Sequence, residues 1–362
     1  MKKHVDFTLL ITIIILAIFG IICVYSASNI AAKYKYNDEF YFFKRQLLFL
    51  VIGFILMFFV SKIDLDKVKK YTSYIFYFVL ILLILVLIPG IGKVAGGARS
   101  WIGFGVFSIQ PAEFMKIALI LLLSKYLSSY FEELKKFINF MIILLLIGLI
   151  FGIILLQPDF GTGLVIVLSG FILLFIGGVP IKYFVLLGII GLFGLGGLII
   201  SEPYRMKRIF AFLDPWSDPL GSGFQGIQSL FALSPSGLFG LGFNNSIQKH
   251  FFLPEPQNDF IFAIISEEFG LIGGGFIVFA YLFIFIKAIR ISSRVEDNYK
   301  SFLSIGLGLS IFVQVIINIS VVIGLLPITG ITLPIISYGG SSLIITLMSL
   351  GLLLNISRYQ ER

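Results

Sequence analysis

The chain has few charged residues and almost none of the residues that form disulfides or bind zinc. Only 13% of its 362 residues are charged, whereas 58% are hydrophobic. A soluble protein needs far more polar surface to cover its core, so this composition excludes a water-soluble globular fold. The single Cys23 excludes a disulfide framework and a cysteine-based zinc site. The only histidines, His4 and His250, lie far apart, which excludes a histidine-rich metal centre.

The positive charge does not indicate nucleic-acid binding. The net charge is +8, but the Lys and Arg residues do not cluster with aromatic residues in one polar domain. They stand between hydrophobic runs that are long enough to cross a bilayer. Charges in such positions orient a membrane protein and attract anionic lipids, so we expect membrane lipids and no nucleic acid as partners.

The hydrophobic runs predict an all-α polytopic membrane protein with about ten transmembrane helices. The first run, from Phe7 to Ala27, is longer than the apolar part of a typical cleaved signal peptide, so we interpret it as a retained helix. No fixed-period repeat or linker divides the chain, so residues 1–362 are treated as one membrane domain. The predicted spans are 7–27, 46–61, 71–89, 114–127, 138–156, 162–178, 184–200, 260–287, 302–326 and 341–357.

The distribution of positive charge predicts the orientation of the chain. With the N-terminus inside, sixteen Lys and Arg residues lie in inner loops or at inner helix ends, against six in short outer loops. This asymmetry favours a multi-pass protein of the cytoplasmic (inner) membrane with both termini in the cytoplasm. Residues 201–259 then form a long extracytoplasmic loop between helices 7 and 8. A loop of this length is usually functional, and its aromatic and basic residues suit a position near lipid headgroups.

Three outer loops end in an acidic residue that leads into a helix. These residues are Glu113, Asp159 and Asp259. An acid at this position can cap the positive helix N-terminus, and capping alone could explain Asp159. Lys116 follows Glu113 by one turn, on the same helical face and just inside a span. Ionisable groups at membrane depth cost about 2.5–3.5 kcal/mol each at a helix centre, so we favour a functional site at Glu113 and Asp259.

Other polar patterns carry weaker signals. Asp64 and Asp66 match an Asp-x-Asp metal pattern, but their short cytoplasmic loop has no room for a nucleotide-binding domain, so we predict a solvated loop and no metal site there. The segment 337–342 offers hydroxyl and backbone N–H groups that could bind phosphate or sugar, and a flexible helix start explains it equally well. Glu267 and Glu268 follow the Asp259 position about two turns deeper.

Several longer motifs resemble the SEDS family of FtsW, RodA and SpoVE. The resemblance runs from about Asp6 to Tyr359, and residues 214–221 and 355–359 look most like the FtsW and SpoVE branch. The chain has Asn258 where the family often has threonine, and serine near positions 234–236 where glycine is common, but the acidic residue after position 258 is present. The motifs that carry the resemblance occupy, in order, residues 97–103, 107–116, 157–161, 253–262 and 334–342.

The resemblance implies a peptidoglycan glycosyltransferase that polymerises lipid II into glycan strands on the outer face of the membrane, for cell shape, cell division or sporulation. Its partner would be a class B penicillin-binding protein, the transpeptidase that crosslinks the strand. Asp259 would be the catalytic base, with inversion at the anomeric carbon as the undecaprenyl pyrophosphate leaves. The sequence leaves open whether a divalent cation, Mg²⁺ or Mn²⁺, assists this step. Candidate substrate-binding residues are Arg99, Trp101, Gln110, Glu113, Lys116, Arg205, Lys207, Arg208, Ser337 and Ser341.

Two other functions fit part of the same pattern. A lipid II flippase would also need membrane-depth charges and a polar cavity. A non-catalytic scaffold could use charged pairs to hold its helices together while it recruits a transpeptidase. The long outer loop with an acid at its end favours an enzyme that acts outside the membrane, and the family resemblance favours it further.

Overall fold

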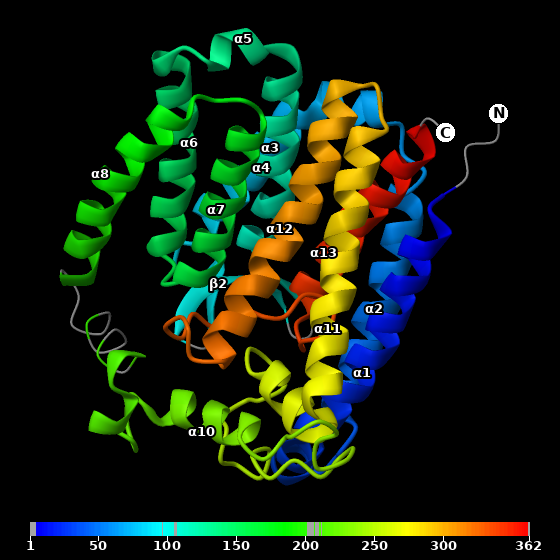
Figure 1. Ribbon diagram of the computed structural model, residues 1–362, viewed down its shortest axis with the longest axis vertical. Helices are drawn as coiled ribbons and strands as arrows, with labels where there is room; N and C mark the ends of the chain where they lie inside the picture. Colours follow the sequence, from blue (N-terminus) through cyan, green and yellow to red (C-terminus); the bar gives the residue numbers. More distant parts are fainter. Residues whose placement is uncertain are drawn as a thin grey trace.

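The computed structural model describes residues 5–95, 97–104, 107–200, 206, 210 and 212–360. Within this part of the chain, each of the ten predicted spans overlaps one helix of at least 17 residues, although several helix ends differ from the predicted bounds. Figure 1 shows these helices as one bundle. They are α1 (Phe7–Tyr36), α2 (Tyr41–Val60), α3 (Leu65–Leu85), α4 (Pro111–Ser129), α6 (Phe137–Leu155), α7 (Phe160–Ile176), α8 (Ile181–Ile200), α11 (Ile261–Ser293), α12 (Asn298–Val322) and α13 (Gly340–Ile356).

Seven of the helices in the described ranges are long and apolar enough to cross a membrane, so the chain is a multi-pass membrane protein. α7 is apolar but slightly shorter than the other spans. α4 is of sufficient length but carries Glu113, Lys116 and Lys125, which lower its hydropathy. That α4, α7 and α8 also cross the membrane, which would give ten crossings, remains a prediction.

Some helices continue well beyond their hydrophobic runs. α1 has 30 residues and ends at Tyr36, where Asn37 adopts a left-handed conformation and its N–H bonds back to the Lys33 carbonyl. At 1.5 Å per residue its length is about 45 Å, more than the roughly 30 Å of a hydrocarbon core. α1 is therefore long enough for its last turns, which carry Lys33 and Lys35, to project beyond the lipid.

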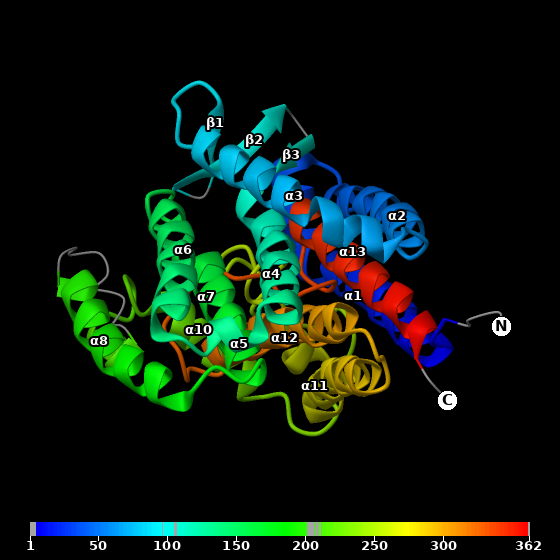
Figure 2. The same ribbon diagram turned by 90° about the horizontal axis from the view of Figure 1, so that it is seen from above.

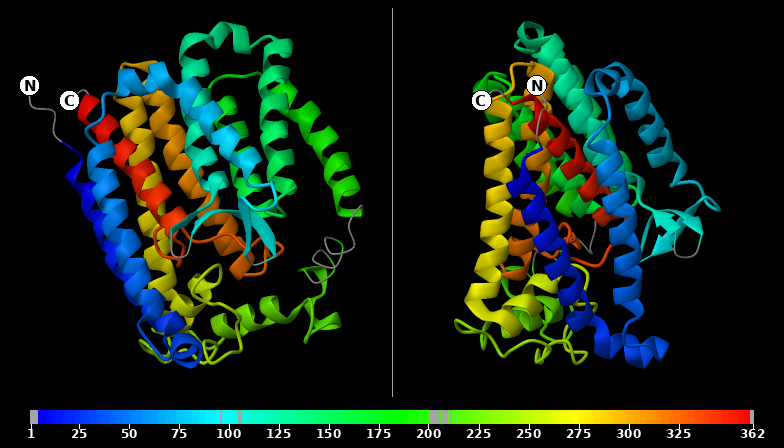
Figure 3. Two further views of the ribbon diagram at one scale, coloured as in Figure 1. Left: turned by 180° about the vertical axis from the view of Figure 1, so that it is seen from behind. Right: turned by 90° about the vertical axis from the view of Figure 1, so that its right-hand side faces the viewer.

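The chain termini and the long loop lie at opposite ends of the bundle. The N- and C-terminal ends are neighbours in Figure 1, whereas the short helix α10 (Phe224–Leu233), the 3₁₀ turn η1 (Pro215–Ser217) and the irregular backbone up to residue 260 lie at the far end. The views from behind and from the side in Figure 3 show the same separation. For residues 212–259, the continuously described part of the predicted loop, this places the segment at one end of the bundle, and the side of the membrane on which each end lies remains a prediction.

Asp6, near the N-terminus, contacts both the C-terminal segment and α11. The backbone N–H of Asp6 donates to the Ser357 hydroxyl at 3.0 Å, and the Asp6 carboxylate binds Lys287 at 2.9 Å. Asp6 also caps α1 by accepting the N–H of Leu9 at 3.0 Å. Burial acts to raise the pKa of Asp6, but the hydrogen bonds from Thr8 and Lys287 hold that pKa below its ordinary value of 3.8.

A small antiparallel sheet between α3 and α4 was not predicted. Its strands are β1 (Gly92–Ala95), β2 (Ala98–Phe104) and β3 (Phe107–Ile109), in the order β1-β2-β3. Figure 2 shows it at the edge of the bundle, beside α3. The strands are too short, and too rich in glycine, to give a clear alternating pattern in the sequence. β3 leads directly into the N-terminus of α4.

α12 and α13 form the centre of the bundle. In the most apolar 18-residue stretches of α12 and α13, 72% and 83% of the residues are buried. The corresponding fractions are 22% in α3 and 28% in α6, which face outward. Close packing depends on small residues. A Cβ at Gly308 would lie 2.3 Å from Ala288 on α11, and one at Gly351 would lie 2.7 Å from the Met57 backbone on α2. The first contact holds α12 against α11 and the second holds α13 against α2, while α4 packs against α12 on its other side (Figure 2).

Candidate active site

A buried acid–lysine pair lies at the start of α4. Pro111 opens the helix, which places Glu113 in its first turn, where the helix dipole favours a carboxylate. Glu113 Oε2 lies 2.7 Å from Lys116 Nζ one turn later. Both residues are less than 7% exposed. Two charges removed from water require further polar partners, because their mutual attraction alone does not repay the desolvation.

α12 supplies that partner through a side chain that the sequence analysis missed. Lys116 Nζ donates to Gln314 Oε1 at 2.6 Å, and Gln314 Nε2 donates to the Thr332 carbonyl at 2.9 Å. One turn further along α12, Asn318 Nδ2 donates to the carbonyl of Ile331 at 2.7 Å and to that of Asp259 at 2.8 Å. Two buried amides spaced four residues apart in an apolar span were a signal that could have found this polar face.

Asp259 occupies the end of the long loop, immediately before α11. It is half-buried, and its neighbour Phe260 is fully buried. The carbonyl of Gln257 accepts the N–H of Tyr338 at 2.8 Å, which joins this loop to the segment between α12 and α13. Since Gln314 and Asn318 are one helical turn apart, the Lys116 ammonium and the Asp259 backbone contact α12 about 6 Å apart along its axis. The predicted acid and the predicted cation are thus brought to one face of one helix.

The two predicted serines have different surroundings. Ser341, in the first turn of α13, accepts the N–H of Gln110 and donates to the Ser108 carbonyl, both at 3.2 Å, so it joins α13 to the β3–α4 junction. The Ser337 hydroxyl accepts the N–H of Leu333 at 2.8 Å and is only 3% exposed. In this structure Ser337 therefore stabilises the segment between α12 and α13, which is non-helical backbone enclosed by protein.

Gln110 connects the α4 end to α7. Its Nε2 donates to Asp159 Oδ2 at 2.6 Å, while Asp159 Oδ1 accepts the N–H of Thr162 at 3.1 Å. Asp159 is therefore an N-cap of α7, which is the explanation that the sequence left open for this residue. It is also part of the polar network around α4, which the sequence did not indicate.

Five predicted binding residues lie away from this network or outside the described residues. Arg99 and Trp101 are in β2, where Arg99 Nη1 approaches the Leu87 carbonyl at 3.5 Å and Trp101 pairs with Lys93 of β1. β2 packs against α4 and pairs with β3, which leads into α4, but neither Arg99 nor Trp101 is among the hydrogen-bonded residues of the network described above. The remaining three lie outside the described ranges; they are Arg205, Lys207 and Arg208.

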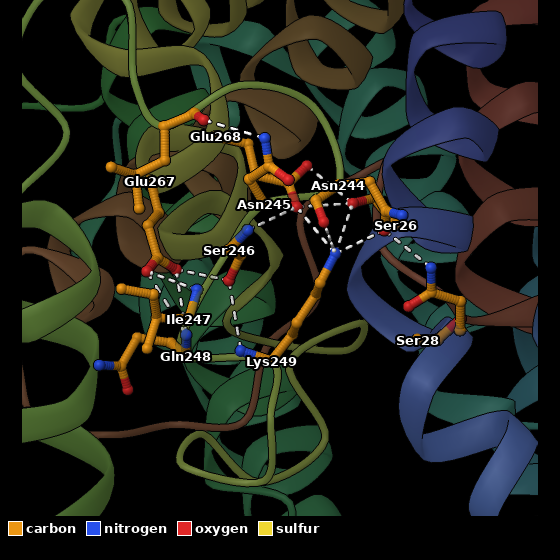
Figure 4. A network of polar contacts seen from close by, with 12 residues as sticks. Ser26, Ser28, Asn244, Asn245, Ser246, Ile247, Gln248, Lys249, Glu267 and Glu268 are labelled. Carbon is orange, nitrogen blue, oxygen red and sulfur yellow. Dashed lines mark hydrogen bonds and ion pairs between the residues drawn. The ribbon is translucent and has the colours of Figure 1, made fainter.

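A second cluster of buried charge anchors the long loop to α1 and α11 (Figure 4). Glu268 accepts hydrogen bonds from the Ser26 hydroxyl at 2.6 Å and from Lys249 Nζ at 3.3 Å. Lys249 also donates to the Asn244 carbonyl at 2.7 Å. Glu268 and Lys249 are at most 3% exposed. Burial lowers the pKa of Lys249, and the negative charge of Glu268 opposes that effect.

Glu267 binds the same loop through its backbone amides. Its carboxylate accepts the Ser246 hydroxyl and the N–H of Ile247, the latter at 2.9 Å. Glu267 is completely buried, so these donors replace the water that a carboxylate would otherwise bind. The sequence puts the two glutamates about two turns beyond Asp259, and in the structure both of them have partners in the loop.

A break in α11 makes room for this loop. Gly270 has φ +65° and ψ −158°, and a Cβ there would lie 2.4 Å from the Leu238 carbonyl oxygen, so only glycine fits. The carbonyls of Glu267 and Glu268 accept the N–H groups of Leu241 and Gly242, both at 2.9 Å. The N–H groups that follow the break donate to carbonyls of residues 237 and 238. The loop backbone thus replaces the helical hydrogen bonds that the break removes.

These features define a polytopic helical membrane protein with a buried acid–lysine site near one end of the bundle and a loop acid beside it. The family model described as FTSW_RODA_SPOVE, Cell cycle protein, matches residues 7–362. The chain belongs to this family.

Named relatives cover nearly the whole chain. Stage V sporulation protein E of Bacillus subtilis is 51% identical over 99% of both chains. The probable peptidoglycan glycosyltransferase FtsW of Geobacter sp. (strain M18) is 41% identical over 97% of this chain and 96% of its own. A chain in a solved structure described as structural coordination of polymerization and crosslinking by a peptidoglycan synthase complex has a TM-score of 0.78, with 30% identity and 99% coverage of both chains. RodA of Thermus thermophilus has a TM-score of 0.72 and 26% identity, covering 99% of this chain and 98% of its own.

Proposed function

We propose that this chain is a peptidoglycan glycosyltransferase that polymerises lipid II and uses Asp259 as its general base. The relatives named as glycosyltransferases support the reaction class, since the similarity extends over almost the full length of the chain. One structural observation carries the assignment of the base. Asp259 ends the long loop on the α12 face that also holds the Glu113–Lys116 pair through Gln314.

The reaction is a displacement at the anomeric carbon of the donor sugar. The Asp259 carboxylate takes the proton of the acceptor hydroxyl, the freed oxygen forms the new glycosidic bond, and the bond to the undecaprenyl pyrophosphate breaks on the opposite face. The configuration is therefore inverted. General-base catalysis of this kind typically supplies 10²–10⁴-fold, which is roughly 3–5 kcal/mol of the barrier.

Lys116 contributes positive charge near the leaving pyrophosphate. It is 6% exposed and held by Glu113 and Gln314, so it acts mainly through its field rather than by enclosing a phosphate. In a poorly solvated site that field is screened less than it would be in water. Arg99 on β2, together with Arg205, Lys207 and Arg208 of the long loop, remains a candidate for direct phosphate contact.

A divalent cation would find few protein ligands here. The described residues include no group of three or more His, Cys, Asp or Glu side chains that could hold a metal. Mg²⁺ is commonly held by one or two carboxylates together with substrate phosphates. Asp259 and the lipid pyrophosphate would have to supply the ligands if Mg²⁺ or Mn²⁺ assists the reaction.

We further propose the cellular setting. The protein lies in the cytoplasmic (inner) membrane with both termini in the cytoplasm and residues 201–259 outside. A class B penicillin-binding protein crosslinks the product alongside it, which the similarity to a chain of a peptidoglycan synthase complex supports. The higher identity to the sporulation protein than to the FtsW relatives favours wall synthesis during sporulation over cell division.

The test is polymerisation of labelled lipid II by the purified protein in liposomes, with and without its transpeptidase. We expect glycan strands from the complex and little polymer from the chain alone, because few of its groups extend beyond the membrane to hold a growing strand. Lipid II that crosses the liposome membrane without being polymerised would instead identify a flippase. Recruitment of an active transpeptidase with neither activity would identify a scaffold.

A further inference from the structure

α12 carries two amide side chains that contact both halves of the proposed site. Gln314 and Asn318 lie one turn apart on the same face and are 3% and 2% exposed. Gln314 accepts from Lys116 and donates to Thr332, whereas Asn318 donates to Ile331 and Asp259. Both amides use backbone carbonyls of the segment that precedes α13.

Asn318 donates to the backbone carbonyl of Asp259, which lies just outside α11. α11 begins at Ile261, and the Phe260 carbonyl accepts the N–H of Ala263, so the Asp259 carbonyl lies just before the start of the helix. No side chain caps this helix start. The 2.8 Å hydrogen bond from Asn318 therefore fixes the backbone that carries the Asp259 carboxylate.

Gln314 has the equivalent role at the cation. A lysine ammonium has three donors and no preferred plane, so its position depends on the acceptors around it. Glu113 and Gln314 lie 2.7 Å and 2.6 Å from Lys116 Nζ, and they come from different helices. Gln314 is itself fixed by its hydrogen bond to Thr332, whose hydroxyl donates to Ser342 of α13.

We propose that Gln314 and Asn318 are positioning residues that set the separation between the Lys116 ammonium and Asp259. The backbone of α12 fixes the spacing of the two amides, and α12 is itself held by close packing against α11. This inference rests on the proposed role of Asp259 as the base. Because a displacement of about 1 Å can cost 10²-fold in rate, loss of either amide lowers turnover while lipid II still binds.

The experiment compares two buried asparagines that make the same hydrogen bonds. Asn355 is also 2% exposed, and its Nδ2 donates to the carbonyls of Val60 and Ile63 at 3.0 Å and 2.7 Å. It lies near the C-terminal end of α13, at the end of the bundle away from the long loop (Figure 1). Asn318→Leu and Asn355→Leu therefore remove equal numbers of bonds from similar environments.

With purified protein, its transpeptidase and labelled lipid II, we expect Asn318→Leu to lower kcat by roughly 10–10²-fold, with KM changed by less than about threefold. Asn355→Leu should lower the midpoint of thermal unfolding to a similar extent and leave kcat within about threefold of the unmodified protein. Equal losses of kcat in the two variants would overturn the inference. If Asn318→Leu does not fold, Asn318→Ser, which keeps one donor, takes its place under the same criteria.

A double-mutant cycle separates positioning of Asp259 from a general defect. If Asn318 acts through Asp259, Asn318→Leu should cost little further activity once Asp259→Asn is present. The same fold loss in both backgrounds would show that Asn318 acts elsewhere and would contradict the inference. Full activity of Asp259→Asn alone would instead refute the proposed base, so the two failures can be told apart.

Gln314→Glu tests the cation side. The carboxylate still accepts from Lys116 but cannot donate to Thr332, whereas Gln314→Met can do neither. We therefore expect kcat to be highest in the unmodified protein, lower in Gln314→Glu and lowest in Gln314→Met. A Gln314→Met protein with unmodified kcat would remove Gln314 from the proposal.

Discussion

Loss of the Lys249 ammonium should destabilise the protein more than any exposed lysine substitution. Lys249→Met keeps most of the unbranched apolar side chain but leaves Glu268 buried beside Ser26 without its counter-charge. The two charged side chains are each 1% exposed, so water cannot replace the lost partner. Breaking a buried ion pair by removing one partner typically costs about 3–5 kcal/mol.

Judged by distance alone, the Lys44–Asp38 ion pair would contribute more to stability than the Lys249–Glu268 pair, which is the opposite of what we expect. Lys44 and Asp38 are closer, at 2.8 Å against 3.3 Å, but their side chains are 66% and 35% exposed. Exposed pairs contribute about 0–1 kcal/mol, so Lys44→Met is the matched control and should change stability little. Lys249→Met combined with Glu268→Gln should be more stable than the sum of the two single losses predicts, by about 0.5–3 kcal/mol.

The assay is thermal or denaturant unfolding of the purified protein in one detergent, followed by intrinsic fluorescence. We expect a much lower midpoint for Lys249→Met, a small change for Lys44→Met, and partial recovery in the double variant. Similar midpoints for the two lysine variants, or strictly additive losses in the double variant, would refute the view that buried charge anchors the long loop.

Three further predictions concern topology, the polar network and pH. A cysteine at Ser222 should react with an impermeant thiol reagent in intact cells and one at Ser293 should not; the reverse labelling would contradict the orientation. Lys116→Met should lower polymerisation to a level between the unmodified protein and the base variant, whereas Asp159→Asn should cost about 1 kcal/mol or less of stability and leave much of the activity; equal activities of these two variants would count against Lys116. Because the pKa of Asp6 is below 3.8 in the folded protein, its contribution to stability is present above that pH and lost as the pH falls through the folded value. The difference in unfolding midpoint between Asp6→Asn and the unmodified protein should therefore disappear in acid, and a constant difference would contradict this reasoning.

The helices were predictable because each one contains a run of apolar residues. The sequence placed α1 and α11 correctly, but it could not show that α1 continues to Tyr36 or that α11 breaks at Gly270. Those features depend on a helix cap and on a contact with the loop, and neither produces a periodic pattern of apolar residues in the sequence. The sheet from β1 to β3 was missed for a similar reason, since its strands are as short as three residues.

The site was only partly predictable because sequence shows charge but not contact. Glu113 and Lys116 are one turn apart, so their ion pair could be expected from helical spacing alone. The link from Lys116 to Gln314 joins residues 198 positions apart, and the one from Asn318 to Asp259 joins residues 59 apart. Such pairings arise only from the packing of α12 against α4 and α11.

The most direct test of the account is the polymerisation rate of Asp259→Asn. Asparagine keeps the size of the side chain and can form hydrogen bonds, but it cannot take the acceptor proton at neutral pH. We expect the rate of glycan-strand synthesis from labelled lipid II, measured with the transpeptidase present, to fall by about 10²-fold or more while membrane insertion and binding of the transpeptidase persist. A purified Asp259→Asn protein that builds glycan strands at the unmodified rate would contradict the account.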